Sequence, residues 1–324
     1  MQMKTISILV PCYNEEAVLE AFYERTSKVL DSIEGYAFLF IFVNDGSGDR
    51  TLDILRGLHE RDERVSYIDL SRNFGKELAM VAGMDACDSD ALVIMDADLQ
   101  DPPELLPEMV AWWEKGYQDV SARRRSREGE TFFKKWSSHT YYKLLQKVSD
   151  IPVQRDVGDF RLLDRQCVEA LKRLREPQRY TKGLFTWVGF SKKEILFDRD
   201  ARLAGATKWN YWKLFNLAIE GITGFTIVPL RIASFLGFLM AVLSMTYMFV
   251  IIGKTLLYGE PVAGYPSMIS IILFLGGLQM LVLGIIGEYL GRVFNESKHR
   301  PLYLVKEYKR AGGSRGSLRR RDKE

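Results

Sequence analysis

The sequence predicts an α/β domain with a mostly parallel sheet, followed by a hairpin of two transmembrane helices. Over roughly the first 200 residues, short apolar runs alternate with segments whose apolar residues recur at helical spacing, as in parallel strands joined by crossover helices. Two later stretches, 232–253 and 266–287, each hold 22 residues without a charge. At 1.5 Å per residue, each stretch is long enough to cross a hydrocarbon layer of about 30 Å. Buried core helices are the alternative interpretation of these stretches.

The elements of the α/β domain are predicted from their apolar patterns and turn residues. We expect strands at 6–11, 38–44, 65–70 and 91–95 and near Val120, and helices over 15–32, from 50, over 76–86 and from 102.

Two of these helices carry capping signals at their start. Asp49 is expected to cap the helix that begins at Arg50. The clearer signal follows the strand at 91–95, because Asp101 stands at the expected N-cap, Pro102 at the first helical position and Glu104 three residues after the cap.

We divide the chain into four parts. They are the α/β domain (1–208), an amphipathic interfacial segment rich in aromatic and basic residues (209–231), the two transmembrane helices with their connection (232–290) and a basic tail (291–324). The tail has eleven basic and four acidic residues, which places the C-terminus in the cytoplasm by the positive-inside rule. The start of the chain has no signal-peptide pattern, so we expect both termini in the cytoplasm and a multi-pass protein of the inner or plasma membrane. From Ala311 the tail is polar and glycine-rich, and we expect it to be disordered.

The three cysteines do not suggest a disulfide framework or a zinc site. Cys12, Cys87 and Cys167 are far apart in the sequence and form no CxxC pair. We expect three buried thiols in a reducing compartment.

A pair of carboxylates follows directly on the strand at 91–95. Asp96 and Asp98 form a DxD sequence where ligands bind in open α/β sheets, at the carboxyl end of a strand, and Gln100 adds an amide oxygen. Such hard oxygen ligands suit Mg²⁺ or Mn²⁺, which complete their shells with water and substrate phosphates. A DxD sequence alone also occurs in acidic loops without a ligand.

A second carboxylate, Asp45, ends the strand at 38–44 in the sequence VNDGSGD. There it could accept hydrogen bonds from a ribose hydroxyl or a base N–H, or it could belong to a simple Asp-Gly turn. The chain has neither GxGxxG nor GxxxxGK[ST], so a bound nucleotide would need a metal and basic side chains for its diphosphate. Residues 123–135 supply six basic side chains that suit an anion, although a solvated basic loop is the alternative.

Several motifs, in this order, resemble the polyprenyl-phosphate branch of the family 2 glycosyltransferases. They are LVPCYNEE, VNDGSGDRT, SRNFGKE, MDADLQDPPE, GDFRLLDR and GEYLGRVFNESKHRPLY. The closest likeness is to bacterial undecaprenyl-phosphate (bactoprenol) glucosyltransferases, with dolichyl-phosphate mannose synthases and aminoarabinose transferases as relatives. The resemblance extends to about Tyr308 and implies a GT-A type nucleotide-sugar-binding domain. The QxxRW string of processive members is absent, which favours a single transfer over polymerisation.

The resemblance also implies roles for individual residues. The uridine part of a UDP-sugar would be held by Pro11, Tyr13, Glu15 and Asp45. The metal ion, Mg²⁺ or Mn²⁺, and the diphosphate would be held by Asp96, Asp98 and Gln100, with Asp96 serving the nucleotide-sugar as well. Asp159 matches an aspartate treated as catalytic. The phosphate of the lipid acceptor would be bound by Arg123, Arg127 and Lys208.

The implied reaction is the inverting transfer of one sugar, glucose being favoured, to polyprenyl phosphate for cell-envelope glycans. A phosphate monoester with a second pKa near 6 is already nucleophilic at neutral pH, so Asp159 either orients groups or acts as a base. We expect a nucleotide-sugar, a polyprenyl phosphate and a bilayer as partners, and no nucleic acid. Small residues in the second apolar stretch would allow homo-oligomers. Mannose, GlcNAc, galactose or aminoarabinose as the sugar, a non-catalytic nucleotide-sugar-binding protein and a transporter subunit remain alternatives.

Overall fold

The computed structural model describes residues 3–125, 157–177, 179, 181–197, 228–258 and 264–312. The chain divides into two compact units. The first comprises residues 1–142, 151–211 and 301–324, and the second comprises residues 143–150 and 212–300.

The first unit is built on an eight-stranded sheet with the order β7-β5-β6-β4-β1-β2-β3-β8. The strands are β1 (Lys4–Cys12), β2 (Tyr36–Asn44), β3 (Val65–Leu70), β4 (Ala91–Ile94), β5 (Asp119–Arg124), β6 (Val157–Asp164), β7 (Lys192–Phe197) and β8 (Val305–Lys309). Strand β1 pairs in parallel with β2 and β4, β2 with β3, and β5 with β7. Strand β6 is antiparallel to β4 and β5, and β8 is antiparallel to β3. The predicted mostly parallel α/β sheet is confirmed.

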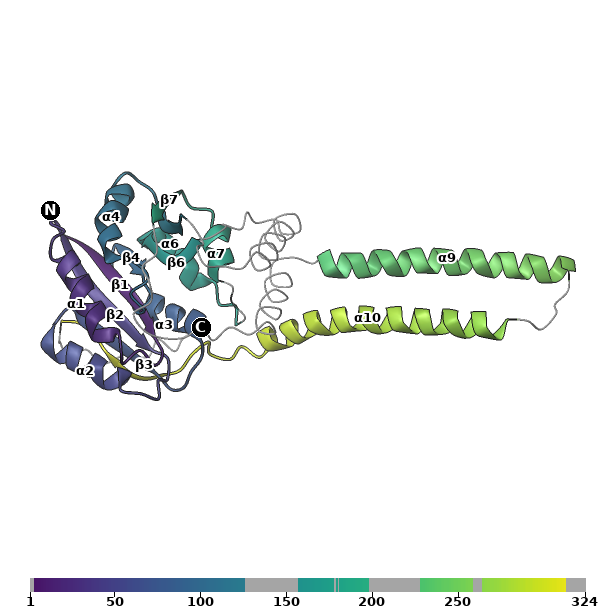
Figure 1. The fold of residues 1–324 in the computed structure, drawn as a ribbon, viewed down its shortest axis with the longest axis horizontal. Coiled ribbons are helices and arrows are strands. Elements are labelled where there is room, and N and C mark those ends of the chain that lie inside the picture. Colours follow the sequence, from purple (N-terminus) through teal and green to yellow (C-terminus); the bar gives the residue numbers. More distant parts are fainter. Residues whose placement is uncertain are drawn as a thin grey trace. The chain divides into compact units, whose positions relative to one another are not determined.

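Helices cover both faces of this sheet (Figure 1). They are α1 (Leu19–Leu30), α2 (Thr51–Arg61), α3 (Lys76–Ala86), α4 (Leu106–Glu114), α6 (Arg165–Arg173) and α7 (Thr181–Trp187). Helices α1, α2 and α4 bury their apolar residues in one core with alternate residues of β1 and β2, such as Ile8 and Phe40. Helix α3 packs on β1, β2 and β3, and also contacts α6. Gly83 of α3 allows a close approach, because a Cβ there would lie 2.0 Å from Leu9 Cδ1.

The predicted cap at Asp101 is wrong. The chain after β4 forms a 3₁₀ turn, η1 (Pro103–Leu105), and α4 begins only at Leu106, with Leu105 as its N-cap. Asp101 is buried and accepts a hydrogen bond from the backbone of Asp96, so its carboxyl group closes the preceding loop instead of capping a helix. Glu104 pairs with Arg25 of α1, at 2.8 Å.

The helix that Asp49 was predicted to cap begins one residue later than expected. The carboxylate of Asp49 accepts a hydrogen bond from the N–H of Thr51 at 3.0 Å, and α2 begins at Thr51 with Arg50 as its N-cap.

Residues 301–312, expected from the sequence to form part of the basic tail, belong to the first unit. Strand β8 extends the sheet beyond β3, and the N–H of Ser71 donates to the carbonyl of Leu304 at 2.9 Å. Tyr303 donates to Asp85 at 2.6 Å, and Glu307 accepts from Arg56 and Tyr67. The sequence VKEYK is too short and polar to indicate an edge strand by its own pattern. The predicted disordered tail lies outside the described residues from position 313 onward.

The second unit contains two long helices, α9 (Val228–Tyr258) and α10 (Tyr265–Ser297), which cover the two stretches predicted to be helical spans. Within α10, Phe274–Ser297 is the one described segment long and apolar enough to cross a membrane, with a mean hydropathy of 1.5 and no buried residues. The apolar segment of α9 described with it, Ile232–Tyr247, is shorter. The predicted interfacial segment lies outside the described residues except for 228–231, which begin α9.

Candidate active site

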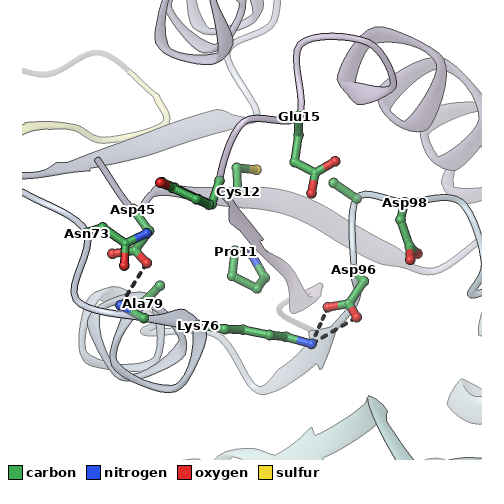
Figure 2. Close-up of a pocket in the computed structure, with 12 residues that line it drawn as sticks. Pro11, Cys12, Glu15, Asp45, Asn73, Lys76, Ala79, Asp96 and Asp98 are labelled. Carbon is green, nitrogen blue, oxygen red and sulfur yellow. Dashed lines mark hydrogen bonds and ion pairs between the residues drawn. The ribbon is translucent and has the colours of Figure 1, made fainter. Parts of the chain in front are cut away.

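Three parallel strands end at one edge of the sheet and bring the predicted donor residues together. Residues that end or follow β1, β2 and β4 line a pocket of about 230 Å³ (Figure 2). Its lining consists of Pro11, Cys12, Tyr13, Glu15, Asp45, Asn73, Gly75, Lys76, Ala79, Asp96, Ala97 and Asp98. Six predicted site residues therefore share one pocket: Pro11, Tyr13, Glu15, Asp45, Asp96 and Asp98.

One part of this pocket, which we call the Asp45 side, consists of Pro11, Tyr13 and Asp45, whereas the carboxylate of Glu15 lies toward Asp98 (Figure 2). The carboxylate of Asp45, 2% exposed, accepts from the N–H groups of Phe74 at 2.7 Å and Gly75 at 2.9 Å. Burial raises the pKa of Asp45, and these two backbone hydrogen bonds offset part of that rise. Each carboxylate oxygen keeps a second lone pair with which it can accept a hydrogen bond from a ligand.

Backbone contacts hold the loops of the Asp45 side together. Gly46 has a φ of 65°, and a Cβ there would lie 2.5 Å from backbone atoms of Arg72 and Asn73, so only glycine fits without displacing that loop. Asn14, also with a positive φ, donates its N–H to Ser47 Oγ at 3.0 Å. The loops after β1, β2 and β3 therefore support one another.

The opposite part, the Lys76 side, consists of Lys76, Asp96, Asp98 and Asp159. The ammonium of Lys76 lies 2.6 Å from Asp96 Oδ1 and 2.6 Å from Asp159 Oδ2. Partial burial lowers the pKa of Lys76, but the two carboxylates outweigh burial and raise that pKa above its ordinary value. Burial raises the pKa of Asp159, and the nearby positive charges, Lys76 first, more than offset it and bring the pKa to about 2.

The antiparallel direction of β6 explains how Asp159 reaches this edge. The pairing of β4 with β6 runs from Ala91 opposite Asp164 to Ile94 opposite Arg161, so Asp159 lies beyond the last paired residue of β4. Arg161, on the same face of β6, is buried and donates to Asp119 at 3.0 Å, with its guanidinium over the ring of Phe185. Asp159 thus stands on a strand held by a buried ion pair.

The loop after β4 offers carboxylates for a divalent cation. No group of three His, Cys, Asp or Glu residues poised for a metal occurs among the described residues. Asp96 and Asp98 nevertheless provide two carboxylates at the pocket, the number that Mg²⁺ commonly uses together with substrate phosphates. Burial raises the pKa of Asp101 to about 7, and the negative charges of Asp96 and Asp98 add to this rise. The neighbouring carboxylates would suit a cation.

Gln100, the third predicted metal ligand, is buried and lies outside the pocket lining. Its N–H donates to Asp98 Oδ1 at 3.2 Å. Leu99, between them, has a φ of 59°, an uncommon conformation for a residue other than glycine and one that recurs at functional sites.

The predicted phosphate-binding residues are described only in part. Arg123 of β5 pairs with Glu194 of β7 at 3.0 Å and remains partly exposed. Arg127 and Lys208 lie outside the described residues.

Lys76 lines the pocket and pairs with two predicted site residues, but the sequence analysis did not single it out. The motif SRNFGKE contains it, and Lys76 directly follows Gly75 at the start of α3. The helix dipole disfavours a lysine in the first turn, so a lysine at this position is a signal for an acidic partner, and this signal could have found it.

The sequence matches two protein-family models. Residues 7–172 match glycosyl transferase family 2, and residues 228–293 match the GtrB C-terminal hairpin. The first match covers β1 to α6 with the pocket, and the second covers α9 and most of α10. Together with the apolar character of α10, this hairpin indicates association with a membrane.

Similar proteins cover almost the whole chain. An uncharacterized glycosyltransferase of Synechocystis sp. is 47% identical over 302 residues, which are 93% of this chain and 95% of that protein. The bactoprenol glucosyl transferase of Shigella phage SfV is 42% identical over 304 residues, which are 94% of this chain and 99% of that protein.

The chain is also similar to a solved structure of glucosyl-3-phosphoglycerate synthase from Mycobacterium tuberculosis in complex with Mn²⁺, UDP and glucosyl-3-phosphoglycerate. The similarity covers 68% of this chain and 78% of the synthase chain. It has a TM-score of 0.46 and 19% identity. On the family match and the near-complete coverage by relatives, the chain belongs to glycosyl transferase family 2, with a GT-A type domain and a GtrB-type hairpin.

Proposed function

We propose that this protein transfers one glucosyl residue from UDP-glucose to the phosphate of a polyprenyl phosphate, such as undecaprenyl phosphate, at a membrane surface. The observation that carries the proposal is the match to proteins named bactoprenol glucosyl transferase, which extends over 93–94% of this chain and includes the hairpin. The pocket, with carboxylates on both sides, has the chemistry that this reaction needs.

The donor would lie along the edge of the sheet from Asp45 to Asp96. On the Asp45 side, the free lone pairs of the buried carboxylate would accept hydrogen bonds from the ribose or the uracil, beside Pro11 and Tyr13. A pocket of about 230 Å³ is smaller than the usual range for ligand sites, so the donor would extend out of it toward Asp159.

Asp96 and Asp98, supported by Gln100, would hold Mg²⁺ or Mn²⁺. When bound, the cation would offset the negative charge of the leaving diphosphate. The protein's own residues then position the reactants. Lys76 pairs with Asp159 beside the pocket, and Arg123, with Arg127 and Lys208, would attract the acceptor phosphate.

The acceptor phosphate supplies its own nucleophile. A phosphate monoester carries about −1.5 to −2 charges at neutral pH, so one of its oxygens can attack the anomeric carbon without giving up a proton. The new bond joins that oxygen to the anomeric carbon, the bond between this carbon and the UDP oxygen breaks, and UDP leaves with the electron pair. A single displacement of this kind inverts the anomeric carbon.

We assign Asp159 an orienting and electrostatic role in this reaction. Its pKa of about 2 makes it a weak base at neutral pH. An ionised carboxylate is better suited to orient a sugar hydroxyl or to stabilise positive charge that develops at the anomeric carbon.

The sheet supports a hairpin topology in the membrane. Strands β1 to β7 precede α9 and α10 in the chain, and β8 follows them, yet all eight strands belong to one sheet. A sheet lies on one side of a membrane, so the chain between β7 and β8 crosses an even number of times. Because this part of the chain holds the two long helices α9 and α10, we propose two crossings, and the basic residues after α10 favour the cytoplasm for the catalytic domain and both termini.

A donor panel tests the proposed function. Purified full-length protein is mixed with undecaprenyl phosphate, Mg²⁺ or Mn²⁺, and each of several UDP- and GDP-sugars, and the released nucleoside diphosphate is measured. We expect release with UDP-glucose that depends on the lipid. Lipid-dependent release with another donor would assign another sugar, and no release with any donor would contradict the enzymatic function.

A further inference from the structure

The segment at the start of α3 contacts both sides of the pocket. Phe74 and Gly75 donate their N–H groups to Asp45, and the next residue, Lys76, reaches both Asp96 and Asp159. Glu77 accepts from the N–H and the hydroxyl of Thr181, the first residue of α7. The backbone that carries Lys76 is therefore held from two directions, while its long side chain extends into the pocket (Figure 2).

Lys76 stands among carboxylates. Among the described residues that line the pocket, it is the one basic side chain, against the four acidic side chains of Glu15, Asp45, Asp96 and Asp98. Asp159, outside that lining, is its other carboxylate partner. The side chain of Lys76 is 39% exposed, so it is not locked in a dry core.

We propose, on the basis of the proposed function, that Lys76 is a positioning residue for the transfer, whose ammonium holds Asp159 in place and competes with a divalent cation for Asp96. The ammonium has three N–H donors and approaches both oxygens of Asp96, at 2.6 and 2.8 Å. A cation bound to Asp96 would use the same two oxygens and would stand beside the ammonium, a group of like charge. Each positive group therefore weakens the binding of the other at Asp96, and Lys76 keeps Asp159 as its second partner.

This competition has a consequence for the reaction. Asp96 exchanges one positive partner for another, so the carboxylate is never left without a counter-charge in this partly buried pocket. Asp159 keeps the ammonium in both situations and is therefore oriented when a donor arrives. If Lys76 only stabilised the fold, its replacement would lower the melting temperature. It would not raise the cation affinity while lowering turnover.

The experiment compares Lys76→Met, Lys76→Arg and the matched control Lys28→Met in the full-length protein in detergent. Lys28 is an exposed residue near the end of α1, so its substitution removes one charge without touching the pocket. Binding of Mn²⁺ without nucleotide is followed by electron paramagnetic resonance of the free ion. Turnover and the donor KM are measured with UDP-glucose and undecaprenyl phosphate, and the melting temperature is recorded for each variant.

For Lys76→Met we expect Mn²⁺ binding that is tighter by about threefold or more, because the competing charge is gone. In the same variant, kcat should fall by about tenfold to a hundredfold as Asp159 loses its partner, with the donor KM changed by less than about threefold. Lys76→Arg keeps the charge and should restore much of the wild-type Mn²⁺ affinity and part of kcat. Lys28→Met should match the wild type in all measurements.

Unchanged Mn²⁺ affinity in Lys76→Met would overturn the competition, and unchanged kcat would overturn the positioning role. Weaker Mn²⁺ binding together with a lower melting temperature would assign Lys76 a structural role and would also overturn the inference. The Mn²⁺ titration does not need turnover. If wild-type protein transferred no sugar from any donor, the proposed function and the positioning role would fail, while the competition would still be decided by the titration.

Discussion

The two sides of the pocket hold their carboxylates in different ways. On the Asp45 side, the carboxylate accepts two backbone N–H groups from the loop before α3, and Gly46 packs directly on that loop. On the Lys76 side, Asp96 and Asp159 meet the tip of one flexible side chain. The Asp45 side is therefore fixed by backbone geometry, whereas the Lys76 side can exchange its counter-charge.

This difference suits the two tasks of a glycosyl transfer. A nucleoside has the same shape and charge throughout the reaction, so a rigid set of acceptors is sufficient to bind it. The charge at the diphosphate and the anomeric carbon changes during transfer, and this part of the site benefits from groups placed where charge develops. Substitutions on the Asp45 side should thus change donor affinity, and those on the Lys76 side should change turnover.

The largest expected effect concerns the support of the Lys76 side. Arg161→Leu would leave the carboxylate of Asp119 buried without its partner, because both side chains are almost fully buried, at 1% and 0% exposure. We expect a loss of about 3–5 kcal/mol of stability, seen as a lower thermal unfolding midpoint. The control Arg61→Leu removes an exposed pair with Glu20 and should cost at most about 1 kcal/mol. If the two changes lowered stability equally, the buried ion pair of Arg161 with Asp119 would not stabilise the strand that carries Asp159.

Asp159→Asn should lower kcat by about a hundredfold or more, since the neutral amide neither pairs with Lys76 as a charge nor stabilises positive charge on the donor. Donor binding should remain within a few-fold of wild type. UDP release and equilibrium binding of UDP-glucose measure the two quantities. Asp164→Asn, on the same strand, alters the N-cap of α6 and should affect stability more than kcat. An unchanged kcat in Asp159→Asn would remove Asp159 from the reaction.

Asp45→Asn should weaken donor binding by about tenfold. The NH₂ group of the asparagine would face the backbone N–H of Phe74 or Gly75, and two donors cannot form a hydrogen bond. At saturating donor, kcat should change much less. The KM for UDP-glucose and its binding constant are the relevant measurements. A fall in kcat with no change in donor affinity would contradict the assignment of donor binding to the Asp45 side.

The last substitution tests the backbone of the Asp45 side. Gly46→Ala would force a Cβ to 2.5 Å from the backbone of Arg72 and Asn73 at a positive φ, and should cost about 1–3 kcal/mol of stability. Gly48→Ala, two residues on, introduces a Cβ with no neighbour within 4 Å and should be nearly neutral. Thermal unfolding measures the stability of both variants. Equal stability of the two variants would contradict the packing of the loop before α3 on Gly46.

The parallel strands and the carboxylates that follow them could be predicted from the sequence for a local reason. Apolar runs mark β1, β2 and β4, and the residues that follow parallel strands meet at one edge. The positions of Asp45, Asp96 and Asp98 directly after such runs therefore predict that they lie close together, and all three line one pocket.

The Lys76 side depends on pairings that local patterns do not encode. Asp159 reaches Lys76 and Asp96 because β6 runs antiparallel to β4 with a particular register, and Lys76 reaches both carboxylates from a separate helix. Strand β8 was missed for a similar reason, since its pairing with β3 joins residues more than 230 positions apart. The cap expected at Asp101 failed because its carboxyl group is drawn into the loop after β4.

The most direct test of the proposed function is to identify the product. Full-length protein is incubated with UDP-glucose, undecaprenyl phosphate and Mg²⁺, and the lipid fraction is analysed by mass spectrometry and by NMR of the anomeric proton. We predict one hexose on each modified lipid phosphate, equimolar UDP and a β-configured anomeric carbon. UDP release without a glycolipid, or a glycolipid with an α-configured sugar, would contradict a single inverting transfer to the lipid phosphate.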